Sequence, residues 1–206
     1  LAQCFCPKGS WVLCLDRTHW DFGVTKINFL VLAVAHNGVA MPLFWVWLPK
    51  KGNSNTTERQ QLIDRFLSVF GVEKIGYLTA DREFRGRTWL QYLVDQRIPF
   101  CLRIPNNTKV WNRHKNQQMK VSRLFSLRQK EQMSLNKQRT IWGITVYLSC
   151  AMGPKGRVII ASNDHPKTAI DRYAVRWFIE TLFGCLKSRG FDLEKTHLRQ
   201  SDRLEK

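Results

Sequence analysis

The sequence lacks long apolar runs and has few acidic residues, and both absences narrow its class. No apolar run approaches the roughly 18 residues that a membrane span needs, and the candidate at residues 27–35 is about half that length, so we expect no membrane partner. Asp and Glu number 16 against 33 Lys and Arg, which gives a net charge of +17. A charge of this size is typical of proteins that bind a polyanion, above all nucleic acid.

The sequence also lacks cysteine pairs with metal-ligand spacing. Six cysteines are present, none of them in a C-x-x-C pair, so an ordinary zinc knuckle is excluded and reduced thiols in a cytoplasmic protein are expected. There is no internal repeat and no linker long enough to separate two domains. Apolar residues make up 44% of the 206, which indicates one folded domain with a sizeable core.

The sequence predicts a run of strands at the start of the chain, followed by alternating helices and strands. Apolar, β-branched runs joined by short links, one of them the hairpin signal His36-Asn37-Gly38, predict three antiparallel strands. Helical spacing of apolar residues then predicts a helix that Gly71 closes. The predicted elements in order are strands 11–19, 26–35 and 39–48, the helix that ends at 70, strand 74–81, helix 87–97 and strand 98–104.

The stretch 106–140 differs in composition, because it holds nine Lys or Arg and a single acidic residue. Strands resume after it, so we interpret 106–157 as a basic, partly β insertion in one domain that spans 1–206. Residues 164–190 predict one long helix, with Pro166 in its first turn, Asp164 or a neighbour as its cap and Gly190 at its end.

Two aspartates sit where a carboxylate is unexpected. Asp16 follows the apolar run 11–15, which is typical of a buried strand. Burying a carboxylate there costs several kcal/mol of folding free energy unless another group compensates its charge. Asp81 ends a predicted strand, where ligands collect in open α/β sheets. Taken singly, Asp16 is also compatible with a turn former at a strand end, and Asp81 with a helix cap or a salt-bridge partner.

A third acidic residue, Glu180, lies in the predicted last helix. At about 100° per residue, Tyr173, Arg176, Glu180 and Lys187 fall within an arc of about 60°. This stripe is compatible with a solvated face that carries an Arg176–Glu180 pair at i,i+4. If instead Asp16, Asp81 and Glu180 converge, cations must hold them together, and oxygen ligands alone select Mg²⁺ or Mn²⁺. Two such ions support phosphodiester chemistry.

Three motifs resemble the DDE transposases of bacterial insertion sequences, specifically the insertion-sequence-four family. They are LDRTHWDFG around Asp16, YLTADREFRG around Asp81, and YAVRWFIETLFGCLKSRGFDLEKTHL around Glu180. The last motif contains the family's Tyr-Arg-Glu-Lys signature at the four positions of the stripe. The resemblance spans roughly residues 10–200.

The resemblance implies an RNase H-like fold with a mixed five-stranded sheet, flanking helices and a largely β insertion before the last catalytic helix. It implies that Asp16, Asp81 and Glu180 bind two Mg²⁺ or Mn²⁺ ions. Arg176 and Lys187 would contact DNA phosphates, and Tyr173 would help position the transposon end. The reaction would be hydrolysis at the element ends followed by attack of a 3′-hydroxyl on target DNA.

Double-stranded DNA is thus the expected partner, with a homodimer in the full-length form and no small-molecule substrate. Family members are longer, so we expect this chain to lack the N-terminal end-binding region and the C-terminal dimerisation region. Two alternatives stay open: a catalytically silent or truncated relic that only binds DNA, and another RNase H-like nuclease.

Overall fold

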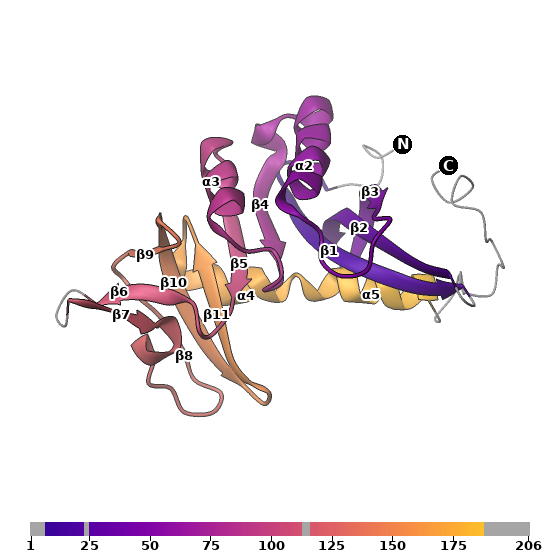
Figure 1. Ribbon diagram of the computed structural model, residues 1–206. Helices are drawn as coiled ribbons and strands as arrows, with labels where there is room; N and C mark the ends of the chain where they lie inside the picture. The colour runs from indigo at the N-terminus through magenta and orange to yellow at the C-terminus, as the bar shows by residue number, and fades with distance from the viewer. Residues whose placement is uncertain (1–6, 23–24, 113–115, 188–206) are drawn as a thin grey trace. The chain divides into compact units, whose positions relative to one another are not determined.

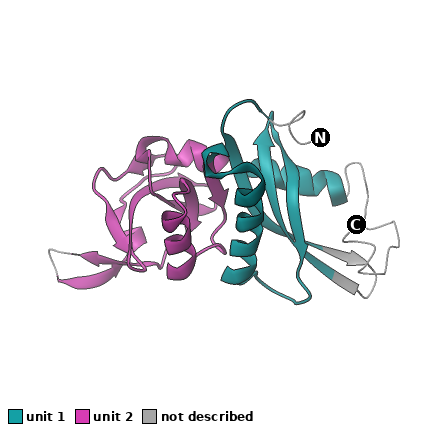
Figure 2. Ribbon diagram, turned by 90° about the horizontal axis from the view of Figure 1, so that it is seen from above, with its two compact units in different colours: residues 1–76, 176–206 teal, residues 77–175 magenta. Residues whose placement is uncertain are grey.

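The computed structural model describes residues 7–22, 25–112 and 116–187 (Figure 1). The chain divides into two compact units, which Figure 2 draws in different colours. Unit 1 comprises residues 1–76 and 176–206, and unit 2 comprises residues 77–175. Within the described part of the chain, no helix is long and apolar enough to cross a membrane.

Unit 1 is built on the three antiparallel strands that the sequence predicts. Strand β2 pairs with β1 on one side and with β3 on the other. The predicted hairpin is confirmed, because Asn37 and Gly38 both have positive φ, of 48° and 84°, as a tight two-residue turn requires. The elements of unit 1 are β1 (Trp11–Phe22), β2 (Thr25–His36), β3 (Val39–Trp47), α2 (Thr56–Phe70), η1 (Val72–Lys74) and α5 (Trp177–Lys187).

The two faces of β1 are covered by different helices of unit 1. Trp11 packs edge-on against Phe66 and Phe70 of α2, with ring centroids 6.1 and 5.0 Å away. Side chains alternate along a strand, so Asp16 lies on the face opposite Trp11, and there it contacts the segment that opens α5. Figure 1 shows α2 and α5 on the two sides of these strands.

Helix α2 begins with a capping box at Asn55 and ends where the sequence predicts. The side chain of Asn55 accepts a hydrogen bond from the Glu58 N–H, and Glu58 accepts one from the Asn55 N–H in return. Gly71 ends the helix with φ 77°, which confirms the predicted stop.

Unit 2 contains a mixed sheet, since β4 pairs with β5 in parallel while β5, β11, β10 and β8 pair antiparallel in that order. Strand β9 pairs with β10, and β6 and β7 form a separate hairpin. The elements are β4 (Ile75–Ala80), whose first two residues belong to unit 1, and then α3 (Arg87–Asp95), β5 (Phe100–Ile104), β6 (Lys109–Asn112), β7 (Gln117–Lys120), η2 (Val121–Leu124), β8 (Gln132–Ser134), β9 (Arg139–Ile141), β10 (Ile144–Gly153), β11 (Gly156–Ser162), η3 (Pro166–Thr168) and α4 (Ala169–Ala174).

The predicted α/β class is therefore confirmed, with a mixed sheet and flanking helices. The predicted number of five strands is too low, because β11, β10, β8 and β9 extend the sheet beyond β5. The basic stretch 106–157 is partly β, as expected, because it supplies β6 to β10 and the first residues of β11. The order of elements up to residue 104 also agrees with the prediction.

The prediction of one long helix over 164–190 is wrong. The segment forms η3, then α4, and then α5 from Trp177, and a turn at 175–176 separates α4 from α5. Asp164 is not the cap, because the N-cap position of η3 belongs to its neighbour His165, the alternative that the prediction allowed. The Asp164 carboxylate instead pairs with Arg172 at 2.8 Å, and Pro166 opens the first turn of η3 as predicted. The predicted end at Gly190 lies outside the described residues.

Candidate active site

Asp16 lies within β1, which continues to Phe22, so its interpretation as a turn former at a strand end is wrong. Its Oδ1 accepts a hydrogen bond from the Arg17 N–H at 2.8 Å, and its Oδ2 accepts one from Arg176 Nη1 at 3.0 Å. The side chain of Asp16 is only 16% exposed. The charge of this carboxylate is therefore compensated by a guanidinium from a segment 160 residues away.

Arg176 also binds the other predicted carboxylate of unit 1. Its Nη2 donates to Glu180 Oε1 at 2.5 Å, one turn further along the chain. The predicted i,i+4 pair is thus present, but Arg176 is 8% exposed and does not lie on a solvated face. A single buried guanidinium joins Asp16 to Glu180.

The surroundings of this cluster are poorly solvated on the β1 side. Cys14, two residues before Asp16 on the same face, is fully buried. Burial raises the pKa of its thiol to about 12; the nearby Arg176 acts in the opposite direction, and Asp16 adds to the rise. Cys14 is thus a neutral thiol, which leaves Arg176 and the carboxylates to set the charge here.

Asp81 lies in unit 2 and directly follows β4. Its Oδ1 accepts hydrogen bonds from the Tyr173 hydroxyl at 3.1 Å and from Arg103 Nη1 at 3.2 Å. Asp81 is therefore a salt-bridge partner, and it is not the N-cap of α3, which is Gly86. Of the signature residues, Tyr173, on α4, thus donates a hydrogen bond to Asp81.

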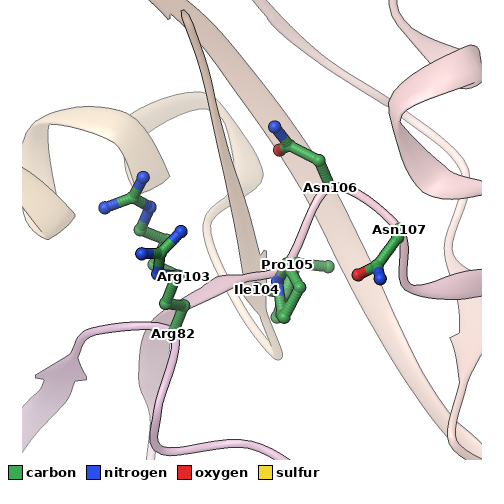
Figure 3. A pocket seen from close by; sticks show the side chains of 6 residues that line it. All are labelled: Arg82, Arg103, Ile104, Pro105, Asn106 and Asn107. Carbon is green, nitrogen blue, oxygen red and sulfur yellow. The ribbon is translucent and has the colours of Figure 1, made fainter. Parts of the chain in front are cut away.

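A pocket of about 260 Å³ lies where β5 ends (Figure 3), and its lining includes Arg103, the partner of Asp81. Two arginines and two asparagines contribute hydrogen-bonding side chains to a lining that is otherwise formed by Ile104 and Pro105. Only Arg103 of the four makes a side-chain hydrogen bond or ion pair with another described residue. The lining residues are Arg82, Arg103, Ile104, Pro105, Asn106 and Asn107. Such a donor-rich pocket is suited to an anion.

Sequence reasoning did not single out Arg103 or the residues of this pocket. A signal was available, because Arg103 is the one charged residue in the otherwise apolar strand β5. Lys187, the predicted phosphate contact, is half-buried at the last position of α5. A cation at this end of a helix interacts favourably with the helix dipole. The structure thus joins Asp16, Arg176 and Glu180 in unit 1, and Asp81 and Tyr173 in unit 2.

The donor set of unit 1 suits a hard divalent cation. Within residues 7–22, 25–112 and 116–187, no three His, Cys, Asp or Glu side chains form a group that could hold a metal ion. Mg²⁺, however, is commonly held by one or two carboxylates together with substrate phosphates, and Asp16 and Glu180 supply two. Thr18, on the same face of β1 as Asp16, adds a buried hydroxyl that lacks a hydrogen-bond partner in the described structure. The residues present therefore fit Mg²⁺ or Mn²⁺ chemically.

Comparison with known proteins identifies the family. The model of the transposase DDE domain matches residues 7–206, so the chain belongs to that family. A solved structure with a similar fold is the cryo-EM structure of a piggyBac transposase synaptic complex with hairpin DNA, with a TM-score of 0.57 and 11% sequence identity. The match covers 87% of this chain and 41% of that one. The likeness confirms the predicted RNase H-like fold. No curated protein matches the sequence.

Proposed function

We propose that this chain carries out DNA transposition by the DDE mechanism: metal-dependent hydrolysis of phosphodiester bonds at transposon ends, followed by 3′-hydroxyl attack on target DNA. The observation that carries the proposal is the cluster in which Arg176 joins Asp16 to Glu180 in a chain of the transposase DDE family. A buried guanidinium that binds two carboxylates is a costly arrangement, and such arrangements are frequent at active sites.

Asp16, Asp81 and Glu180 would hold two Mg²⁺ or Mn²⁺ ions. Bound at a phosphodiester, such ions lower the pKa of water or of a 3′-hydroxyl and stabilise the leaving oxygen. The contribution of the chain is to present carboxylate oxygens from β1, from the end of β4 and from α5. Asp16 and Asp81 stand on or directly after strands, which hold a ligand more firmly than a mobile loop does.

Basic and polar side chains near the carboxylates would hold the DNA. Arg176 and Lys187 would bind phosphates near the scissile bond, and Tyr173 would position the transposon end. The pocket that Arg82 and Arg103 line is suited to a further phosphate, because guanidinium groups match phosphate oxygens in pairs. The net charge of +17 would draw the chain to DNA before any specific contact forms.

We further propose that the transposase is of the insertion-sequence-four type from bacteria, acts as a homodimer in its full-length form and works in the cytoplasm on chromosomal DNA. The spacing of Tyr173, Arg176, Glu180 and Lys187 supports the subfamily. The DNA in the synaptic complex of the piggyBac transposase supports double-stranded DNA as the partner.

The test is nicking of supercoiled plasmid with Mg²⁺ or Mn²⁺, together with DNA binding measured by fluorescence anisotropy. We expect Glu180→Gln to abolish nicking while it retains binding. The matched control is Glu73→Gln, the same chemical change at an exposed residue of unit 1, and it should nick as the wild type does. Nicking that persists in Glu180→Gln would refute the role of Glu180. Binding without any nicking in the wild type would favour the silent DNA-binding relic.

A further inference from the structure

Arg176 occupies oxygens that a divalent cation would need. Its two terminal nitrogens bind different carboxylates, Nη1 at Asp16 Oδ2 and Nη2 at Glu180 Oε1. These are charge-assisted hydrogen bonds, which are roughly twice as strong as neutral ones. A cation that takes the same oxygens must displace a guanidinium that is already well bound.

Electrostatics also opposes simultaneous occupancy. Arg176 is 8% exposed and the Asp16 side chain 16%, so water screens their interaction weakly. A divalent cation on Asp16 would face a guanidinium at hydrogen-bond distance from the same carboxylate. Like charges that share a poorly solvated site repel, so one of the two must withdraw.

We propose that Arg176 competes with divalent cations for Asp16 and Glu180, and that cation binding requires it to release these carboxylates. This inference rests on the metal site of the proposed function. Before a cation binds, Arg176 keeps the two carboxylates together against their mutual repulsion. Once released, its guanidinium is available to a DNA phosphate, so cations and DNA favour each other's binding.

The deciding measurement is the dissociation constant of Mn²⁺ by isothermal titration calorimetry, on the whole chain without DNA. Two hydrogen bonds to charged groups no longer need to be broken in Arg176→Gln, so we expect this variant to bind Mn²⁺ about tenfold more tightly than the wild type. Its melting temperature without metal should fall, and Mn²⁺ should raise that temperature by more than it does in the wild type.

Two further variants separate the explanations. Arg176→Lys keeps the positive charge but lacks the planar fork that reaches two carboxylates at once, so it should bind Mn²⁺ more tightly than the wild type and less tightly than Arg176→Gln. If Arg176→Lys equals the wild type while Arg176→Gln binds more tightly, the effect is through-space charge and the proposed competition is refuted. Asp16→Asn should lose the tight site.

The remaining outcomes decide between this inference and the proposed function. If Mn²⁺ binding requires Asp16 but is equal or weaker in Arg176→Gln, competition is refuted and the metal site stands. If neither the wild type nor any variant binds Mn²⁺, both the metal site and the competition fail. Binding that arises only in Arg176→Gln would support the competition in its strongest form.

Discussion

Unit 1 and unit 2 both hold a predicted catalytic carboxylate against an arginine, but they do so at different depths. In unit 1, Arg176 is almost fully buried and binds two carboxylates. In unit 2, the side chains of Arg103 and Asp81 are 29% and 30% exposed, and a tyrosine hydroxyl shares the same oxygen.

The difference shows how one type of ion pair can serve two purposes. A buried pair is expensive to break, because the partner left behind keeps its charge in a poorly solvated place. An ion pair near the surface contributes little to the free energy of unfolding, because water can solvate either partner at low cost. Asp16, 16% exposed, is therefore fixed by Arg176, whereas Asp81 and the similarly exposed Glu180 can change partners more readily.

The largest effect should come from Arg176→Met in unit 1. It leaves Asp16 with little solvent and without its guanidinium, so the free energy of unfolding should fall by about 3 kcal/mol or more. Urea denaturation followed by tryptophan fluorescence, without divalent cations, measures the loss. Arg176→Lys keeps the positive charge, so its free energy of unfolding should fall by less. A loss below about 1 kcal/mol in Arg176→Met would place the pair among surface salt bridges and remove the contrast between the units.

A second prediction concerns a property in which the units should agree. Burial raises the pKa of Cys14 in unit 1 and of Cys101 in unit 2 from 9.0 to about 12. Above pH 9 the unfolded chain loses a thiol proton that the folded chain keeps, so stability falls as pH rises from 9 towards 12. The slope should be on the order of 1 kcal/mol per pH unit for each thiol.

Melting temperatures between pH 8 and 10.5 test this prediction. Cys14→Ala and Cys101→Ala should each show a shallower decline with pH than the wild type, and to a similar extent. A change of slope in only one of the two variants would show that a neighbouring charge, and not burial, sets the other thiol's pKa.

A smaller effect is expected from Tyr173→Phe in unit 2. This variant removes the hydroxyl that donates to Asp81 Oδ1, which should cost about 1 kcal/mol in the free energy of unfolding. Tyr147→Phe is the matched control, because its hydroxyl makes no hydrogen bond with a described residue. Equal losses in the two variants, measured by urea denaturation, would mean that the Tyr173 hydroxyl contributes nothing through Asp81.

The smallest effect on stability should come from Arg103→Gln, within about 1 kcal/mol of the wild type. Its effect on DNA binding should be larger: the loss of one phosphate contact should make the slope of log K against log salt shallower by about 0.9. The control is Arg97→Gln, which makes the same change at an exposed arginine. Arg97 precedes β5, whereas Arg103 lies within that strand. If both variants change the slope equally, the pocket holds no phosphate of its own.

The sequence predicts the opening strands well because their pattern is strong and local. Runs of β-branched residues and an Asn-Gly turn are sufficient to predict β1, β2 and β3, and apolar residues at helical spacing with the stop at Gly71 predict α2. The cap at Asn55 was not predicted. The break at 175–176 could not be predicted, because apolar spacing continues through it and neither Gly nor Pro marks it.

The candidate site could be predicted only in part for a related reason. The pair of Arg176 with Glu180 follows from helical spacing, since the two residues are four apart. The bond of Arg176 to Asp16 depends on which face of β1 meets α5, and that is a tertiary property. Arg103 was missed because one cation in an apolar strand does not by itself reveal its partner.

The alternation along β1 also constrains how this sequence can vary by descent. Trp11 faces the aromatic residues of α2 and Asp16 faces Arg176, so the odd number of steps between them matters more than the apolar residues that fill it. A Leu-to-Ile exchange at Leu13 or Leu15 would preserve that parity. The deletion of a single residue would turn the carboxylate towards Phe66 and Phe70. Among related proteins, the number of residues between these two positions should therefore vary less than the identities of those residues.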